Sequence, residues 1–328
     1  MSKIGILGMG YNVPKKILTN QDLEKMVETS DEWITQRSGI KERHINNGEY
    51  EGNSDMIIPA CERAIAEAGI DRNKISLIAV GTVTPDFLFP STAAMVQKKL
   101  GIPNAMVFDF EAGCTGFVYG LEIIKGLFSS GNHEYALLVG SEQLSKITNW
   151  AERATCVLFG DGAGAAVIGK RDDAHEIIDV MNCGDGNLGD ILVQPAGGSV
   201  KPSTHETVDG KLHFIEMSGG SEVFKNAITF MSEISKKLLE RNGLKTEDVD
   251  WLIPHQANIR IMDKVGERLG IAREKVVITI DKFGNTSAGS IPIAMGVYLG
   301  GGQIKKGQLL LLTAFGAGFT WGSALIRW

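Results

Sequence analysis

The stretch VQKKLGIP, at residues 96–103, recurs as VGERLGIA at residues 265–272. Each copy has the pattern of a short helix that ends in Leu-Gly-Ile, and each is followed by an apolar segment with strand character. These segments are AMVFDF at 105–110 and KVVITI at 275–280, and both lead through a glycine-containing turn into a second helix-like run. Matched elements in the same order indicate an internal duplication, whereas a single eight-residue match would carry little weight.

Outward from this repeat, strand-like and helix-like segments alternate along the whole chain. The predicted strands are SLIAVGT (76–82), AMVFDF (105–110), YALLVGS (135–141), CVLFGDG (156–162), DWLIPH (250–255), KVVITI (275–280) and QLLLLTAF (308–315). This alternation predicts an α/β architecture in which helices pack on largely buried strands. Together with the duplication it predicts two pseudo-equivalent halves, at residues 1–172 and 173–328.

The composition narrows the class of protein. The 328 residues include 33 Lys and Arg against 39 Asp and Glu, and the net charge of −6 disfavours general nucleic-acid binding. The longest apolar runs, such as LLLLTAFGAG at 309–318, are far shorter than the ~18 residues of a membrane span. The four cysteines lack C-x-x-C spacing, so neither a zinc site nor a disulfide scaffold is expected. We therefore expect a soluble protein of a reducing compartment, the cytoplasm.

One cysteine stands out within EAGCTGFVYG at residues 111–120. Cys114 lies where a predicted strand ends and a helix begins, among small residues that let a substrate approach. At such a position the free N–H groups and the dipole of the helix favour a thiolate. On spacing alone two interpretations stay open: Cys114 is a nucleophile, or it is a small residue of the core.

His255 and Asn285 are the natural companions of Cys114. His255 follows the apolar strand DWLIP, and Asn285 lies 16 residues beyond Leu269, much as Cys114 lies 14 residues beyond Leu100. The duplication therefore brings all three to strand ends on one side of the molecule. The trio fits a cysteine hydrolase, in which histidine is the base and asparagine orients it. It equally fits a decarboxylating condensing enzyme, in which both side chains hydrogen-bond a forming enolate.

Longer motifs resolve this choice by resemblance. The chain resembles the β-ketoacyl-acyl-carrier-protein synthase III family, the initiating condensing enzymes of type II fatty-acid synthesis, over essentially its whole length. The similar stretches are TSDEWITQRSGIKERHI (29–45), FPSTAA (89–94), GCTGFVYGL (113–121), FGDGAGAAVI (159–168), EVFKNA (222–227), PHQANIRI (254–261), FGNTSAGSIPIA (283–294) and AFGAGFTWGSALIRW (314–328). The resemblance implies a thiolase-like fold with duplicated halves in αβαβα layers.

The same resemblance assigns the chemistry. Cys114 is expected to take the acyl group from acyl-CoA, while His255 and Asn285 stabilise the enolate formed when malonyl-acyl-carrier protein loses CO2. The backbone N–H groups of Cys114 and Ala317 are expected to form the oxyanion hole, where a donor contributes roughly 3–4 kcal/mol in other enzymes. No metal and no other cofactor is implied, because acyl-CoA is a substrate.

Further residues match binding positions of the family. Trp33 and Arg153 are expected to clamp the CoA adenine, with Thr29 and Arg37 nearby, since indole and guanidinium groups stack on planar bases and arginine also pairs with phosphate. Without the resemblance, Trp33 would be interpreted as a core residue of an amphipathic helix.

Four other positions are expected around the substrate tunnel. Arg260 and Lys225 match basic residues that meet the acidic carrier protein at the tunnel mouth, although Lys225 could equally be an ordinary solvated side chain. Phe89 matches a residue that crosses a homodimer interface into the pocket of the partner, and Leu144 is expected to line the acyl pocket.

The chain departs from the family pattern in three places. Gly113 stands where alanine is more common, and Ala317 stands where glycine is common, changes that a backbone donor tolerates. The loop MSGGSEVFK at 217–225 is one residue longer than usual and has Ser221 where a longer polar side chain is common, which puts its contacts with the pantetheine arm in doubt.

Several alternatives remain at this stage. A related thiolase-fold enzyme of secondary metabolism, or one that makes hydroxymethylglutaryl-CoA, would share the fold, but the latter needs a catalytic glutamate for which the sequence suggests no candidate. A thioesterase-like cysteine hydrolase and a non-catalytic binder of the carrier protein belong to other classes. The preferred starter acyl group stays undetermined, because one methylene changes discrimination by only about 1–3 kcal/mol.

Overall fold

The computed structural model describes residues 3–328, and its main feature is a nine-stranded mixed sheet. The strand order is β11-β12-β13-β8-β1-β7-β6-β4-β5. The strands are β1 (Lys3–Asn12), β4 (Ile75–Gly81), β5 (Met106–Phe110), β6 (Tyr135–Gln143), β7 (Asp161–Arg171), β8 (His175–Gly184), β11 (Trp251–Pro254), β12 (Leu309–Gly316) and β13 (Thr320–Arg327).

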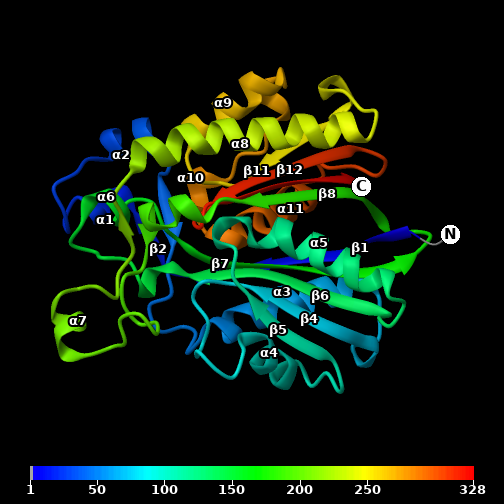
Figure 1. Ribbon diagram of the computed structural model, residues 1–328, viewed down its shortest axis with the longest axis horizontal. Coiled ribbons are helices and arrows are strands. Elements are labelled where there is room, and N and C mark those ends of the chain that lie inside the picture. The colour runs from blue at the N-terminus through cyan, green and yellow to red at the C-terminus, as the bar shows by residue number, and fades with distance from the viewer. Residues whose placement is uncertain (1–2) are drawn as a thin grey trace.

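The sheet is divided into two layers, because β1 and β8 pair over only two residue pairs, Gly5 with Glu176 and Ile6 with His175. Between the layers lie α5 (Gly116–Ser129) and α11 (Ser290–Gly300) (Figure 1). Both helices bury their apolar side chains in one cluster together with strands of both layers. The architecture is therefore built around a shared central pair of helices.

Helices also cover the two outer faces. On one side α3 (Asn53–Ala68) and α4 (Thr92–Leu100) pack against β4, β6 and β7, and on the other α8 (Gly220–Arg241) and α9 (Ile259–Leu269) pack against β11, β12 and β13 (Figure 1). Each outer layer has its own apolar cluster. The predicted layered α/β architecture is confirmed.

The two layers repeat one pairing pattern. In the first, β4 is parallel to β6, which is antiparallel to β7, which is antiparallel to β1. In the second, β11 is parallel to β12, which is antiparallel to β13, which is antiparallel to β8. The division at residues 172 and 173 stays a prediction, and it falls in the turn between β7 and β8.

Five of the predicted strands are confirmed as β4, β5, β6, β11 and β12, and two are wrong. The segment 275–280 makes a single bridge, between Val276 and Leu252 of β11, where its counterpart β5 forms a full strand beside β4. Its backbone is held instead by Gln256, whose Oε1 accepts hydrogen bonds from Thr279 N at 2.8 Å and Ile280 N at 3.2 Å. The segment 156–162 is also not a strand, because α6 (Arg153–Cys156) occupies its start and β7 begins only at Asp161.

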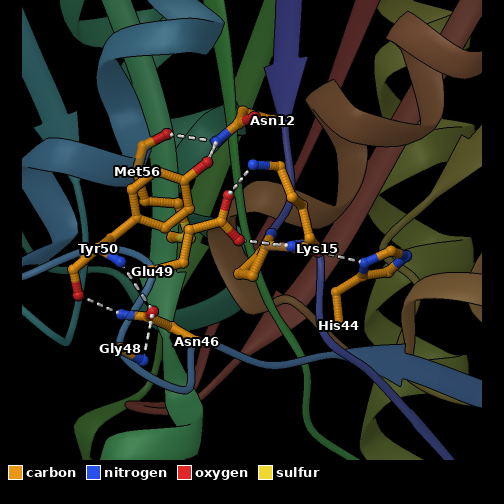
Figure 2. Close-up of polar contacts among 9 residues, drawn as sticks. Asn12, Lys15, His44, Asn46, Gly48, Glu49, Tyr50 and Met56 are labelled. Atoms are coloured by element: carbon orange, nitrogen blue, oxygen red, sulfur yellow. Dashed lines mark hydrogen bonds and ion pairs between the residues drawn. The ribbon is translucent and has the colours of Figure 1, made fainter.

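A polar network fixes the segment between β1 and α3 (Figure 2). Tyr50 and the carbonyl of Met56 both accept from the amide of Asn12, each at 3.0 Å, and Glu49 accepts from the Lys15 backbone at 2.8 Å. Within the loop, Oδ1 of Asn46 accepts from the backbone of Gly48 at 3.2 Å and of Tyr50 at 3.1 Å.

The same loop reaches the start of β7. The backbone N–H of Asn46 donates to the buried carboxylate of Asp161 at 2.7 Å, and the N–H of Ser145 donates to it at 2.8 Å. Asp161 thereby anchors the segments that follow β3 (Glu42–His44) and β6.

The remaining elements are short or peripheral. They are β2 (Ile17–Thr19), α1 (Asn20–Leu23), α2 (Asp31–Ser38), β9 (Leu192–Val193), α7 (His205–Asp209), β10 (Glu216–Met217) and α10 (Ile280–Phe283). Three-residue 3-10 turns lead into the central helices, at Gly113–Thr115 before α5 and at Ser287–Gly289 before α11. Among the described residues no helix combines the length and apolar character needed to cross a membrane.

Candidate active site

Cys114 lies in the 3-10 turn that precedes α5, at the helix N-terminus that the sequence predicts. The turn needs glycine at 113, where φ is 50°. The helix position does not by itself produce a thiolate, however. Burial raises the pKa of the Cys114 thiol to about 12, and the nearby Glu142 raises it further, while hydrogen bonding by Ser287 acts in the opposite direction. The thiol therefore depends on a proton acceptor or on the bound substrate to ionise.

His255 follows β11 and is 2% exposed. Its Nδ1 lies 2.7 Å from the hydroxyl of Ser290, which also accepts from the backbone N–H of Gln256 at 3.4 Å. The described residues offer the Ser290 proton no other acceptor, so we assign it to Nδ1, which leaves the ring proton on Nε2. Burial lowers the pKa of His255 to about 3, so the ring is neutral and acts as a donor.

Asn285 is fixed through both of its ends. Its backbone N–H donates to Leu158 O and its carbonyl accepts from Gly160 N, each at 2.9 Å. Its side-chain Oδ1 accepts from the backbone N–H of Ser287 at 2.8 Å, which sets the orientation of the amide. Within residues 3–328 the Nδ2 group has no hydrogen-bond partner, so it is available to a ligand.

These three side chains line one cavity of about 150 Å3. Cys114 comes from the first half of the chain, and His255 and Asn285 come from the second, so the structure brings the predicted trio together. The cavity presents one nucleophile and two neutral N–H donors. Such donors stabilise negative charge that develops on an oxygen, and a neutral buried histidine with a pKa of about 3 is a poor general base.

A second cavity of about 330 Å3 opens on the other side of Cys114. Leu144, 2% exposed, and Phe159 contribute apolar walls, and Ala317 lies at its edge. The segment carrying Ala317 touches the cysteine turn, because a methyl group added at Gly113 would lie 2.9 Å from Ala317 N. The N–H groups of Cys114 and Ala317 thus belong to neighbouring segments.

The predicted CoA residues form a cluster on α2 and α6. The guanidinium carbons of Arg37 and Arg153 lie 4.8 Å and 4.7 Å from the centre of the Trp33 ring. Arg153 also donates to the carbonyl of Glu28 at 2.9 Å, beside Thr29, whose buried hydroxyl has no partner among the described residues.

Of the two predicted carrier-protein residues, Arg260 lies near the smaller cavity. Arg260, exposed at the start of α9, has its guanidinium carbon 5.1 Å from the ring centre of Phe224, a residue that lines this cavity. Lys225 is exposed on α8. The interpretation of 217–225 as a loop is wrong for its second part, because α8 begins at Gly220.

Phe89 does not enter a pocket of its own chain. It is 86% exposed, and its neighbours Leu88 and Phe87 are 84% and 54% exposed. A continuous apolar segment at the surface of a folded protein is typical of an interface.

Sequence reasoning missed three residues of the site. Ser290 holds His255, Ser287 holds Asn285, and the buried Glu142 accepts a hydrogen bond from Ser287 at 3.3 Å. Both serines stand within the FGNTSAGSIPIA stretch, where their spacing after Asn285 could have drawn attention. Glu142, directly after an apolar strand, is the stronger missed signal, because an acidic residue is seldom wholly buried.

The arrangement of potential ligand side chains bears on whether the protein binds a metal ion. Within residues 3–328, no group of three or more His, Cys, Asp or Glu side chains is placed to hold a metal ion. The expectation that the reaction needs no cofactor stays a prediction.

Comparisons with known proteins agree with the motifs. The family model described as 3-oxoacyl-[acyl-carrier-protein] synthase III matches residues 108–186, and the model of the C-terminal part of this synthase matches residues 239–328. β-Ketoacyl-[acyl-carrier-protein] synthase III of Natranaerobius thermophilus is 50% identical, with 100% of both chains covered. The synthase III of Caldanaerobacter subterraneus is 51% identical over 99% of this chain and 97% of that protein.

A solved structure extends the agreement to the fold. The crystal structure of 3-oxoacyl-[acyl-carrier-protein] synthase III from Aquifex aeolicus superposes with a TM-score of 0.91 at 42% identity, covering 99% of this chain and 100% of that one. The layered, duplicated architecture is thus the thiolase-like fold that the sequence predicts. On full-length identity of about one half and a matching fold, the chain belongs to the β-ketoacyl-acyl-carrier-protein synthase III family.

Proposed function

We propose that this chain catalyses the decarboxylative Claisen condensation of an acyl-CoA starter with malonyl-acyl-carrier protein. The products are β-ketoacyl-acyl-carrier protein, CoA and CO2, and the reaction initiates fatty-acid synthesis. The observation that carries this proposal is the cavity in which the Cys114 thiol meets the side chains of His255 and Asn285.

In the first half-reaction the sulfur of Cys114 attacks the carbonyl carbon of the acyl-CoA. The oxyanion that forms accepts hydrogen bonds from the N–H groups of Cys114 and Ala317, and CoA leaves as its thiol. The acyl chain then occupies the 330 Å3 cavity, against Leu144 and Phe159. Trp33 and Arg153 hold the CoA nucleotide during this step, and Thr29 and Arg37 support them.

In the second half-reaction the carboxylate of the malonyl group leaves as CO2. The electron pair of the broken C–C bond forms an enolate, whose oxygen accepts from His255 Nε2–H and Asn285 Nδ2–H. The enolate carbon attacks the acyl-cysteine, and the Cys114 sulfur leaves and recovers a proton. Two neutral hydrogen-bond donors suit this step, because their hydrogen bonds to the oxygen become strongest when it acquires negative charge in the enolate.

The proposal extends to the partners. Arg260 and Lys225 receive the acidic carrier protein beside the cavity entrance, and the exposed segment around Phe89 pairs two copies of the chain, with Phe89 reaching the acyl pocket of the other copy. We also expect a cytoplasmic location and no cofactor. The starter preference is decided by the experiment below.

Mass spectrometry of the intact protein after exposure to a panel of acyl-CoAs tests the first half-reaction. The expected result is one acyl adduct per chain, absent from Cys114→Ala, and the dominant adduct identifies the starter. With malonyl-acyl-carrier protein added, the acylated enzyme should release CO2 and form the β-keto product. Release of free acid without CO2 would instead identify a cysteine hydrolase, and full function of Cys114→Ala would identify a non-catalytic binder.

A further inference from the structure

Glu142 is a wholly buried carboxyl group at the end of β6, and the reaction as described gives it no role. Its Oε2 accepts from the hydroxyls of Thr82 at 3.1 Å and Thr84 at 2.8 Å. The N–H of Val83 donates to both carboxyl oxygens at 3.1 Å, and the hydroxyl of Ser287 donates to Oε1 at 3.3 Å. All of these donors are neutral, so the carboxyl group is hydrogen-bonded without a cation beside it.

Ser287 connects this carboxyl group to the reacting sulfur. It lines the larger cavity together with Cys114, and hydrogen bonding by its side chain acts on the thiol. Its backbone has φ of 48°, a conformation that is uncommon for a residue other than glycine. That conformation lets the N–H bond Asn285 while the hydroxyl donates to Glu142, and Ser287 lines the same cavity as Cys114. Ser287 therefore joins the cavity of the thiol to the buried carboxyl group.

The thiol proton needs such an acceptor. Burial raises the pKa of Cys114 to about 12, and His255, whose pKa is lowered to about 3, does not accept a proton near neutrality. Burial raises the pKa of Glu142 to about 8, so its carboxylate becomes available at mildly alkaline pH. The other ionisable group that acts on the sulfur is Glu111, whose negative charge also opposes a thiolate.

We propose that Glu142 receives the thiol proton of Cys114 through the hydroxyl of Ser287 during acyl transfer from acyl-CoA. The S–H bond breaks and its proton binds Ser287 Oγ, while the serine proton moves to Glu142 Oε1. The sulfur keeps the electron pair and forms the new C–S bond, the C–S bond of acyl-CoA breaks, and the departing CoA thiolate takes the proton back from Glu142 through the Ser287 hydroxyl. Glu142 touches no substrate and acts as a positioning residue through Ser287.

Electrostatics favours transfer of one proton between the Cys114 thiol and the Glu142 carboxyl group over ionisation of both groups. Two negative charges in this buried region oppose each other, as the effect of Glu142 on the thiol shows. Moving the proton from sulfur to carboxylate keeps a single negative charge in the region throughout. The inference rests on the proposed function, because acyl-CoA is the acyl donor assigned there.

The two half-reactions, measured separately, test this inference. Acylation of Cys114 by acetyl-CoA is followed by quenched-flow mass spectrometry between pH 6 and 9, and CO2 release from malonyl-acyl-carrier protein is followed without a starter. For Glu142→Gln we expect acylation to slow by about 10²-fold or more and to lose its rise with pH, since general base catalysis contributes on the order of 10²–10⁴-fold. Decarboxylation, which uses His255 and Asn285, should stay within about threefold of the native rate.

Two further variants keep the test decisive. Ser287→Ala retains the N–H that holds Asn285 and should reproduce the selective loss of acylation. Asp161→Asn is the matched control, because Asp161 is also a wholly buried carboxyl group whose pKa is raised by burial. Its partners are Asn46 and Ser145, and it is not among the groups that shift the pKa of Cys114. Its ratio of acylation to decarboxylation should match the native ratio.

Three results would overturn the inference. Faster acylation by Glu142→Gln near neutral pH would mean that the carboxylate acts only by repelling the thiolate. Equal losses of both half-reactions in Glu142→Gln and Ser287→Ala would indicate a merely structural role. Native acylation by Ser287→Ala would exclude the hydroxyl as the route. A native protein that performs neither half-reaction contradicts the proposed function itself, which is a separate outcome.

Discussion

The hydroxyl of Ser290 determines which nitrogen of His255 carries the proton. It lies 2.7 Å from Nδ1 and has no other acceptor among the described residues, so we assign its proton to that nitrogen, which leaves Nε2–H for the substrate. In Ser290→Ala the imidazole is free to hold its proton on Nδ1 instead. Because losing a buried hydrogen bond costs about 1–3 kcal/mol, we expect decarboxylation to slow by roughly 10- to 100-fold.

Acylation of Cys114 by acyl-CoA, measured in the same variant, should stay near the native rate, since His255 takes no part in it. Ser232→Ala is the matched control, because Ser232 is a buried helical serine whose hydroxyl bonds Ile228 O at 2.7 Å, on α8 rather than in the site. A native decarboxylation rate in Ser290→Ala would contradict the assigned ring proton.

At this scale the sequence predicts the residues that react but not those that hold them. Cys114, His255 and Asn285 are recognisable because thiol, imidazole and amide groups at strand ends suggest chemistry by themselves. Ser287 and Glu142 meet only in the folded chain, 145 positions apart, and nothing local to either residue signals the contact. The raised thiol pKa is likewise a result of burial, which a helix N-terminus in the sequence does not reveal.

Among the elements, those whose apolar patterns lie in buried layers match the prediction best. β4, β6 and β12 are almost wholly buried, and their continuous apolar runs identify them. The run at 275–280 looks equally strand-like, but the side chain of Gln256 takes the backbone donors that a neighbouring strand would use. The competing interaction comes from a residue about 20 positions earlier, so the pattern alone could not exclude it.

The exposed apolar segment around Phe89 leads to a prediction about dimer formation. In a two-fold dimer each side chain of the interface counts twice, and burying a large apolar side chain contributes about 1.5–3 kcal/mol. Phe89→Ala should therefore weaken the dimer by on the order of 10²-fold or more, as measured by analytical ultracentrifugation across a dilution series. Val200→Ala is the control, because Val200 is 91% exposed but lies outside this segment. A native protein that sediments as a monomer at every concentration would rule out the dimer.

Across the whole molecule, the duplication places two helix N-termini against one site. α5 begins after the turn that carries Cys114, and α11 begins after the turn that carries Ser287, and both helices occupy the shared central layer. The partial positive charge at each N-terminus favours the anions that form beside it. One half of the chain supplies the nucleophile and the other the hydrogen-bond donors, so neither half contains a complete site.

Burial of ionisable groups at this junction also predicts how stability depends on pH. Burial lowers the pKa of His255 from 6.5 to about 3, so the unfolded chain binds more protons below pH 6.5 and stability falls as the pH drops from there. Burial raises the pKa of Glu142 from 4.5 to about 8, so the folded chain keeps a proton that the unfolded chain has lost, and stability falls as the pH rises from 4.5 to 8.

Between about pH 4.5 and 6.5 the two effects have opposite signs and nearly cancel. We therefore expect Tm, measured by differential scanning calorimetry at constant ionic strength, to decline as the pH rises above about 6.5 and as it falls below about 4.5. In Glu142→Gln the alkaline decline should become smaller than in the native protein, and Tm should rise more steeply from pH 4.5 to 6.5, because the opposing effect of Glu142 is removed while His255 still titrates differently in the two states. An alkaline decline of native size in that variant would show that a group other than Glu142 causes it. Glu142 would then lack the raised pKa on which its role as proton acceptor in acyl transfer depends.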